Sequence, residues 1–281
     1  MKSSILTRLI TAFIAIPILV AAIVLMPQYY HPFFFLIILA ATVIGTYEMK
    51  ENVLSKKGKV GNAAYLSILF PIAEFLEQLY LKGSNLVLYI LAIVLGIAFI
   101  IEIFKSPEDN FTSTLDKSSR TVFATIYPGF FTSFVVKLLF LPNSTAYIIL
   151  YFALVFCTDS FAYFFGMAFG KNNRGIFKVS PNKSVAGFIG GMAVPTAVAV
   201  AAPILFADKF AYSPIYGILL GLATSIFSCA GDLIESTFKR SAGIKDSGTI
   251  IPGRGGMLDS LDSLMIAAPV YLFFIELALG A

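Results

Sequence analysis

Charged residues are scarce in this chain of 281 residues: Asp, Glu, Lys and Arg make up 13% of it, and hydrophobic residues make up 58%. A soluble domain carries about a quarter charged residues, so this composition excludes one. Long apolar runs without alternation also argue against an outer-membrane barrel. We therefore expect an all-α, polytopic integral membrane protein whose apolar runs of about 20 residues cross the bilayer as helices.

Three other residue types are absent or rare. Tryptophan is absent, so an aromatic belt at the membrane interface would have to come from Tyr and Phe. Cys157 and Cys229 both lie in apolar runs, where free cysteine behaves as a small hydrophobic residue, and they imply no disulfide framework. The single histidine, His31, lies in a short loop and is expected to be an incidental interfacial residue. Chemistry must therefore be sought among the few charged side chains.

The apolar runs predict about nine transmembrane helices. The first run follows Lys2 and Arg8, is long for a signal peptide and lacks a cleavage site, so we expect it to be retained. Most of the 20 basic residues fall in alternate loops, on one side of the membrane. Positive-inside bias then predicts a cytoplasmic N-terminus and an outside C-terminus. The predicted spans are 8–26, 32–50, 63–81, 85–104, 121–140, 145–169, 186–207, 214–238 and 258–279.

The most polar stretch divides the chain into two predicted bundles. Residues 105–120 form a polar cytoplasmic linker between an N-terminal transmembrane bundle at 1–104 and a C-terminal catalytic bundle at 121–281. In the second bundle, Gly217 and Gly221 form a GxxxG spacing, which favours close helix packing over chemistry.

Charge is concentrated between Gly231 and Ser263. Asp232, Glu235, Ser236 and Lys239 are spaced i, i+3, i+4 and i+7, which places them on one stripe of a helix. A solvated helix end would explain Lys239 and its neighbour Arg240, because cations complement the helix dipole. It explains Asp232 poorly, since this residue lies among apolar neighbours, where an ionisable group is costly and is a functional candidate.

A second acidic pair, Asp259 and Asp262, begins the last predicted span. Acids in a first helical turn are common as caps, so that interpretation stays open. The pair follows the loop Pro252–Gly256, whose glycines could bring backbone N–H groups close to an anion. An arginine within the loop, Arg254, strengthens the functional interpretation.

Together these groups suit phosphoryl or nucleotidyl transfer. Asp232 and Asp259, on separate helices, are the natural pair to hold a divalent cation such as Mg²⁺, which takes one or two carboxylates together with water and substrate phosphates. The cations that could neutralise a polyphosphate are Lys239, Arg240, Lys245 and Arg254.

A third patch covers 159–191. Asp159 lies inside an aromatic-rich span and therefore needs a partner. Lys171, Lys178 and Lys183 could contact phosphate, although Lys171 and Lys178 are equally well explained as topology signals. For Lys183, within Ser180–Ser184, we favour a functional role.

Two motifs resemble those of the phosphatidate cytidylyltransferase (CDP-diacylglycerol synthase) family. Residues 236–262 read S-x-x-K-R-x4-K-D-x5-PG-x-GG-x-L-D-x-x-D, and residues 159–191 contain D-S-x-A-Y, F-G-K and S-P-x-K-S-x-x-G-x-x-G-G. The resemblance covers about the C-terminal 45% of the chain, and the N-terminal half agrees only in hydropathy. Three positions depart from the family pattern: Arg254 replaces His, Ser260 replaces Arg, and Val185-Ala186 replace Trp-Glu.

The resemblance implies a multi-span inner-membrane enzyme, a nucleotidyltransferase that moves CMP from CTP to phosphatidate and releases pyrophosphate. It implies dependence on Mg²⁺, with K⁺ as a possible second metal, and the lipid bilayer as a partner; homodimerisation stays open and no nucleic acid is expected. Carried over to this sequence, it implies that Asp232 and Asp259 are the metal ligands and that Asp246, Asp262, Lys239, Arg240 and Lys245 complete the site. Taken with the residue patterns above, the expected catalytic residues are Asp246, Lys245, Arg254 and Asp262, and the expected substrate-binding residues are Ser236, Lys239, Arg240, Lys183, Lys171 and Asp159.

Two other functions stay open. A CTP-dependent lipid kinase acting on a polyprenol or phytol shares a similar C-terminal pattern and would attack the γ-phosphorus instead of the α-phosphorus. An inactive relative that binds lipid or nucleotide is the other, and the three departures motivate it.

Overall fold

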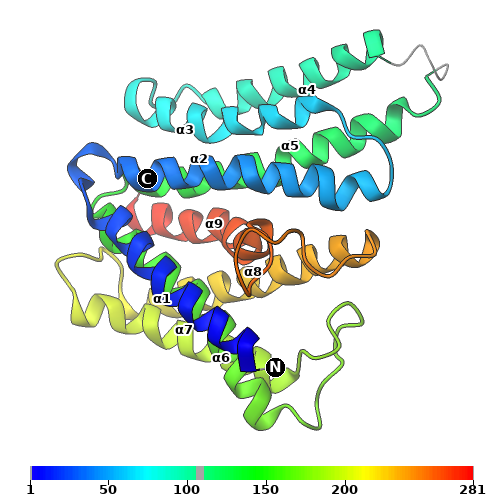
Figure 1. Ribbon diagram of the computed structural model, residues 1–281. Coiled ribbons are helices and arrows are strands. Elements are labelled where there is room, and N and C mark those ends of the chain that lie inside the picture. The colour runs from blue at the N-terminus through cyan, green and yellow to red at the C-terminus, as the bar shows by residue number, and fades with distance from the viewer. Residues whose placement is uncertain (1, 106–110, 281) are drawn as a thin grey trace. The chain divides into compact units, whose positions relative to one another are not determined.

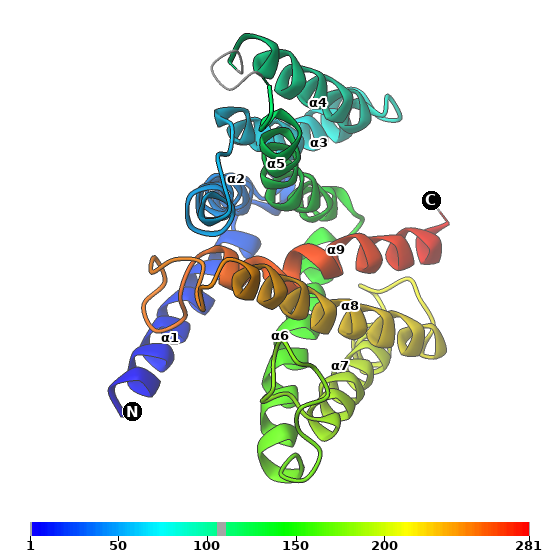
Figure 2. The same ribbon diagram turned by 90° about the vertical axis from the view of Figure 1, so that its right-hand side faces the viewer.

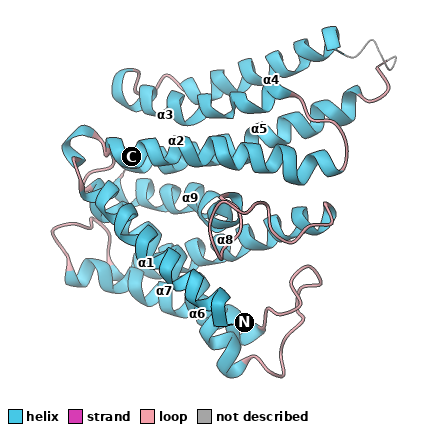
Figure 3. Cartoon of the chain, viewed as in Figure 1, coloured by secondary structure: helices cyan, strands magenta, loops and turns pink. Residues whose placement is uncertain are grey.

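The protein is mainly helical over the residues that its computed structural model describes, 2–105 and 111–280 (Figure 1). Loops and short 3-10 or π-helical turns join the helices, and Figure 3 shows no strand in these ranges. The prediction of an all-α protein is therefore confirmed. The helices are α1 (Lys2–Val24), α2 (Pro32–Tyr47), α3 (Leu69–Tyr80), α4 (Leu86–Lys105), α5 (Thr114–Lys137), α6 (Ser144–Phe169), α7 (Val185–Leu205), α8 (Pro214–Ser241) and α9 (Leu258–Leu279).

Seven of the helical segments in the described residues are long and apolar enough to cross a membrane, which confirms a polytopic membrane protein. They are Pro32–Lys56, Leu86–Phe104, Thr114–Phe140, Ser144–Phe169, Val185–Leu205, Pro214–Ser241 and Leu258–Leu279. The apolar part of α1, Phe13–Val24, is shorter, and α3 has only 12 residues. The count of nine spans and the sides of the two termini stay predictions.

The chain divides into two compact units, each described by itself. The first unit comprises Met1–Phe140 and Phe238–Leu261. In it α3 packs against α4 and α5, and α2 packs against α5 (Figure 2). Hydroxyl pairs join these elements: the hydroxyls of Thr42 on α2 and Thr132 on α5 lie 2.9 Å apart, and those of Thr46 on α2 and Ser67, in the 3-10 helix Asn62–Ile68 before α3, lie 2.7 Å apart. Such interhelical bonds satisfy polar groups within an apolar bundle.

The second unit comprises Leu141–Thr237 and Asp262–Ala281. Close backbone approach holds α7 against α8: a Cβ at Gly217 would lie 2.6 Å from the Ala199 carbonyl oxygen, and one at Gly221 would lie 2.5 Å from the Thr196 Cα. The prediction that this GxxxG pair serves packing is confirmed. The hydroxyl of buried Tyr271 donates to the Tyr147 carbonyl oxygen at 2.7 Å and joins α9 to α6.

The sequence-based division into bundles stays a prediction, because contacts divide the chain differently, after Phe140 and within α8 and α9. Of the predicted linker at 105–120, residues 106–110 lie outside the described residues, and Thr114–Arg120 form the first turns of α5.

His31 has a structural role that the sequence did not indicate. It is buried, and its Nδ1 lies 2.6 Å from the Ile23 carbonyl oxygen, which ties the loop to the end of α1. Burial lowers the pKa of its imidazole.

Candidate functional site

The first unit contains a buried group of polar side chains, which we call the carboxylate centre: Glu48, Lys239, Ser247 and Asp259. Asp259 stands in the first turn of α9, and its Oδ1 accepts a hydrogen bond from Lys239 Nζ at 2.5 Å. Its Oδ2 accepts from the backbone N–H groups of Ser247 at 2.8 Å and Gly256 at 2.7 Å. Because these donors offset the cost of burying the charge, Asp259 can remain ionised with only 6% of its side chain exposed.

Glu48, like Ser247, is a member of the centre that the sequence analysis missed. It begins a π-helical turn, Glu48–Val53, that continues α2. Its Oε1 accepts from the N–H of Met257 at 3.0 Å, and its Oε2 accepts from the N–H of Leu258 at 2.8 Å and the hydroxyl of Ser247 at 3.0 Å. Glu48 therefore caps the start of α9, where N–H groups lack helical partners and a negative charge is favoured.

The glycines of the loop make room for these two carboxylates. A Cβ at Gly256 would lie 2.3 Å from Glu48 Oε2, and one at Gly248 would lie 2.3 Å from Glu48 Oε1. Gly255 has a φ of 112°, and a Cβ there would lie 2.5 Å from Asp259 Oδ2. These distances are far below van der Waals contact, so side chains at the three positions would displace the carboxylates.

The loop does not use these N–H groups as the expected anion-binding nest for a phosphate. Four of them, at Ser247, Gly256, Met257 and Leu258, donate to the protein's own carboxylates. Those of Arg254 and Gly255 donate to the Ile251 carbonyl oxygen and close a turn. Phosphate contacts from this loop must therefore come mainly from side chains.

Several predicted site residues are exposed on or beside the same loop. Lys245 and Asp246 precede Ser247 and are exposed, and Arg254 is exposed in the turn between Ile251 and Gly255. Arg240 is also exposed, and its guanidinium donates to the Ile244 carbonyl oxygen at 3.2 Å. The first unit thus combines buried carboxylates with accessible cations.

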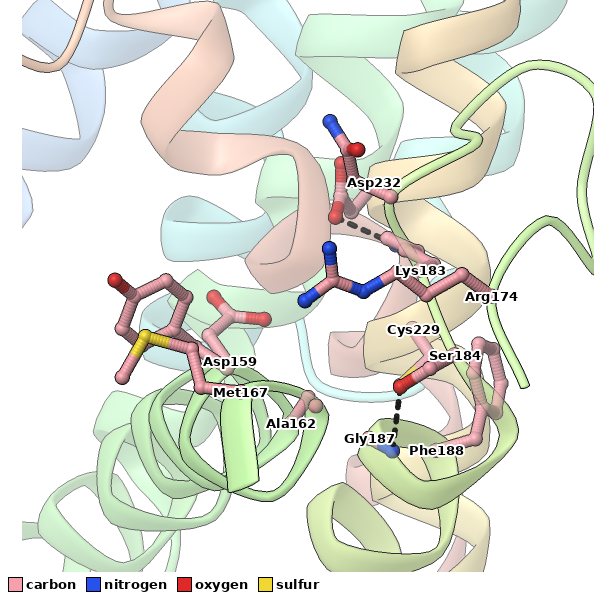
Figure 4. A pocket seen from close by; sticks show the side chains of 13 residues that line it. Asp159, Ala162, Met167, Arg174, Lys183, Ser184, Gly187, Phe188, Cys229 and Asp232 are labelled. Carbon is pink, nitrogen blue, oxygen red and sulfur yellow. Dashed lines mark hydrogen bonds and ion pairs between the residues drawn. The ribbon is translucent and has the colours of Figure 1, made fainter. Parts of the chain in front are cut away.

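The second unit contains a pocket of about 470 Å³ with charged side chains of both signs. Asp159, Arg174, Lys183 and Asp232 line it, and Figure 4 shows them extending towards a common space. Lys183 Nζ lies 2.6 Å from Asp232 Oδ2, with 24% and 36% of the two side chains exposed. On α8, Ser236 donates to Asp232 Oδ1 at 3.3 Å. The pocket therefore offers partly hydrated cations and carboxylates.

The loop before α7 positions the cations of the pocket. Ser184 caps α7, since its Oγ accepts the N–H of Gly187 at 3.1 Å, and Ser184 also forms a backbone bridge with Arg174. This bridge holds the loop segment that carries Arg174 beside the loop segment that carries Lys183. A Cβ at Gly170 would lie 2.5 Å from Ser184 Oγ, so the glycine of the F-G-K motif permits the close turn.

Some predicted residues lie elsewhere. Of the predicted stripe on α8, only Asp232 lines the pocket, whereas Glu235 and Lys239 are buried. Asp262 is buried on α9, where its backbone approaches Gly231. Lys171, predicted to bind substrate, is exposed and does not line the pocket, and the same holds for Lys178.

The residues present suit a hard cation. Carboxylate oxygens are the ligands that Mg²⁺ prefers, and Asp232 keeps a partly exposed carboxylate in the pocket, where Asp159 supplies a second. Across the described ranges, no three His, Cys, Asp or Glu side chains form a metal-binding group. The predicted pair of ligands takes Asp232 from the second unit and Asp259 from the first, so it stays a prediction.

Comparison with known proteins gives the family of the chain. A sequence model of the Cytidylyltransferase family matches residues 6–278. This chain belongs to that family. A phosphatidate cytidylyltransferase of Bacillus subtilis is 35% identical over 167 residues, which cover 59% of this chain and 61% of the relative. That of Haemophilus influenzae is 43% identical over 141 residues, 47% of each chain.

The similarity to individual relatives covers part of their length. A phosphatidate cytidylyltransferase of Staphylococcus haemolyticus is 43% identical over 124 residues, which cover 44% of this chain and 46% of the relative. The matched stretches therefore span about half of the length of these relatives, from 46% to 61%.

Proposed function

We propose that this protein transfers CMP from CTP to phosphatidate, giving CDP-diacylglycerol and pyrophosphate for phospholipid synthesis. Membership of the Cytidylyltransferase family and the names of its relatives support this reaction. The observation that carries the proposal is the pocket of the second unit, where Lys183 and Arg174 lie together with Asp159 and Asp232 in a chain of apolar helices. Phosphate groups require the cations, and the carboxylates suit a metal ion that accompanies a nucleotide.

The reaction needs no nucleophilic side chain. A phosphate oxygen of phosphatidate forms the new bond to the α-phosphorus of CTP, and the bond from that phosphorus to the oxygen between the α- and β-phosphates breaks. This oxygen leaves with the β- and γ-phosphates as pyrophosphate. The protein then has to position the two phosphates and neutralise their charge. We assign phosphate binding to Lys183 and Arg174 in the pocket, and charge neutralisation to the exposed Lys245, Arg240 and Arg254.

Mg²⁺ is the proposed cofactor, and K⁺ is a candidate for a second metal. Asp232 and Asp259 would hold it, and it would supply positive charge to the phosphate oxygens. The hydrogen bonds that Asp259 already accepts from Ser247 and Gly256 would orient its carboxylate as a ligand.

In this proposal the site lies at the cytoplasmic face of the inner membrane. The distribution of basic residues in alternate loops supports this orientation. CTP would then enter from the cytosol, and phosphatidate would enter sideways from the inner leaflet.

CTP labelled either in its cytidine or in its γ-phosphate tests the proposal on the purified full chain with Mg²⁺ and phosphatidate. The cytidine label should appear in the lipid product and the γ-label in pyrophosphate. A lipid kinase would instead place the γ-label on an alcohol such as a polyprenol and release CDP. Transfer of neither label by folded protein that binds CTP would indicate an inactive relative and contradict the proposal.

Two substitutions locate the reaction. Asp232→Asn and Asp259→Asn should each lower kcat by about 100-fold or more, because each removes a carboxylate from the charged site. Asp208→Asn is the matched control, since Asp208 is an exposed loop residue paired with Lys209. Full activity of both Asp232→Asn and Asp259→Asn would contradict the assignment of these two residues as metal ligands.

A further inference from the structure

The π-helical turn at the end of α2 holds one serine of the motif loop at two points. Glu48 accepts the hydroxyl hydrogen of Ser247 at 3.0 Å, and the amide of Asn52 donates to the Ser247 carbonyl oxygen at 2.6 Å. A π-helix places residues four to five positions apart on one face, so the turn directs both side chains towards Ser247. Local departures of this kind are frequent at functional sites.

Ser247 in turn connects Glu48 to Asp259. Its hydroxyl accepts the N–H of Asp259 at 3.3 Å, and its own N–H donates to Asp259 Oδ2 at 2.8 Å. Ser247 directly follows Lys245 and Asp246, the exposed charged pair of the motif. A shift of Ser247 would therefore move both charged side chains and also the oxygen that Asp259 directs towards the loop.

Glu48 also makes more hydrogen bonds than a local helix cap requires. A single side-chain acceptor satisfies one or two of the N–H groups at a helix start. The Glu48 carboxylate, 1% exposed, accepts three hydrogen bonds, from Met257, Leu258 and Ser247. Gly248 and Gly256 leave the space that it occupies. Such a buried acid is costly unless it is fully bonded, so the loop and α2 are held in one arrangement.

We propose that Glu48, together with Asn52, is a positioning residue of the reaction: it fixes the loop 245–258 so that Lys245, Asp246 and Asp259 keep the arrangement needed for nucleotide transfer. This inference rests on the proposed function for its kinetic consequence. Its structural consequence, order in the loop, is measurable without any substrate.

The test substitutes Glu48 by Gln in the purified full chain. The amide keeps the size of the side chain, but its NH₂ group faces donors at Met257, Leu258 or Ser247. Glu102→Gln is the matched control, because Glu102 is also a buried acid of the first unit, 3% exposed, and it pairs at 2.7 Å with Lys117, which does not belong to the loop. Both variants are compared with wild type at equal amounts of folded protein.

The first readout is hydrogen exchange of the peptide that covers 245–258, without nucleotide. Glu48→Gln should raise its exchange rate by tenfold or more, and Glu102→Gln should leave it within about twofold of wild type. The second readout is steady-state kinetics with CTP and phosphatidate, where Glu48→Gln should lower kcat by about tenfold or more. Asn52→Ala should act in the same direction with a smaller effect.

Unchanged exchange in Glu48→Gln would overturn the inference, and so would increased exchange with kcat within twofold of wild type. An equal loss of kcat in Glu102→Gln would also overturn it, because that result would show general destabilisation. If the wild-type chain fails to transfer CMP, the proposed function is wrong, and hydrogen exchange alone still decides whether Glu48 orders the loop.

Discussion

Two lysine–aspartate pairs of nearly equal length have different surroundings. In the first unit Lys239 Nζ lies 2.5 Å from Asp259 Oδ1, and the two side chains are 11% and 6% exposed. Two backbone N–H groups also donate to this aspartate. In the second unit Lys183 and Asp232 lie 2.6 Å apart with 24% and 36% exposed, beside a pocket.

The difference indicates different roles for the two pairs. A buried pair whose carboxylate accepts hydrogen bonds at both oxygens is an arrangement that the fold depends on, because breaking it leaves an uncompensated charge. A partly hydrated pair contributes little to stability, so its two charges can be exchanged for those of a ligand. Substrate contact is therefore expected first at Lys183 and Asp232, whereas the carboxylate centre holds the motif loop in place.

The largest expected effect comes from removing the two lysines in turn. Lys239→Met leaves Asp259 buried without its cation and should lower the free energy of unfolding by about 3–5 kcal/mol. Lys183→Met should lower it by only about 0–1 kcal/mol but should reduce kcat/KM on the order of 100-fold. Thermal unfolding in detergent and initial rates measure the two quantities. Equal loss of stability in both variants would contradict the distinction between the pairs.

A second, smaller effect tests the space around Glu48. Gly256→Ala places a Cβ 2.3 Å from the Glu48 carboxylate, and the resulting displacement should cost about 1–3 kcal/mol of stability together with most of the activity. Gly96→Ala is the control, because a Cβ at this helical glycine meets no atom within 4 Å. It should be neutral or stabilise the protein by up to about 1 kcal/mol. A stable, active Gly256→Ala protein would show that the loop tolerates movement of Glu48.

The sequence predicts the helical fold well and the carboxylate centre only in part. Apolar runs identify most of the helices because length and hydropathy are local properties. Clustered charge identifies Asp259 and Lys239 for the same reason. Glu48 escapes this reasoning, since it lies 199 residues from Ser247 in the chain and outside the charged stretch 231–263. Only tertiary packing reveals that the glycines at 248 and 256 accommodate its carboxylate.

The pocket shows the same limit in the second unit. The sequence singles out Lys183 and Asp232, and the structure pairs them. The sequence alone gives no reason to choose Arg174 over Lys171 as a residue of the pocket, because Lys171 carries the same charge three positions earlier in the same loop. The backbone bridge between Arg174 and Ser184 decides the matter, because it brings Arg174 to the pocket and leaves Lys171 outside it.

The smallest expected effect distinguishes these two cations. Arg174→Met removes a charged donor that lines the pocket and should raise the KM for CTP or phosphatidate by about tenfold, the value of one charge-assisted hydrogen bond to phosphate. Lys171→Met removes the same charge outside the pocket and should change KM less than about threefold, an effect that salt should abolish. Equal changes in the two variants, both sensitive to salt, would mean that the positive field of the loop attracts substrate. Of the two cations that line the pocket, Lys183 alone would then contribute to substrate affinity by direct contact. The difference between the pocket pair and the buried pair would depend on that one side chain.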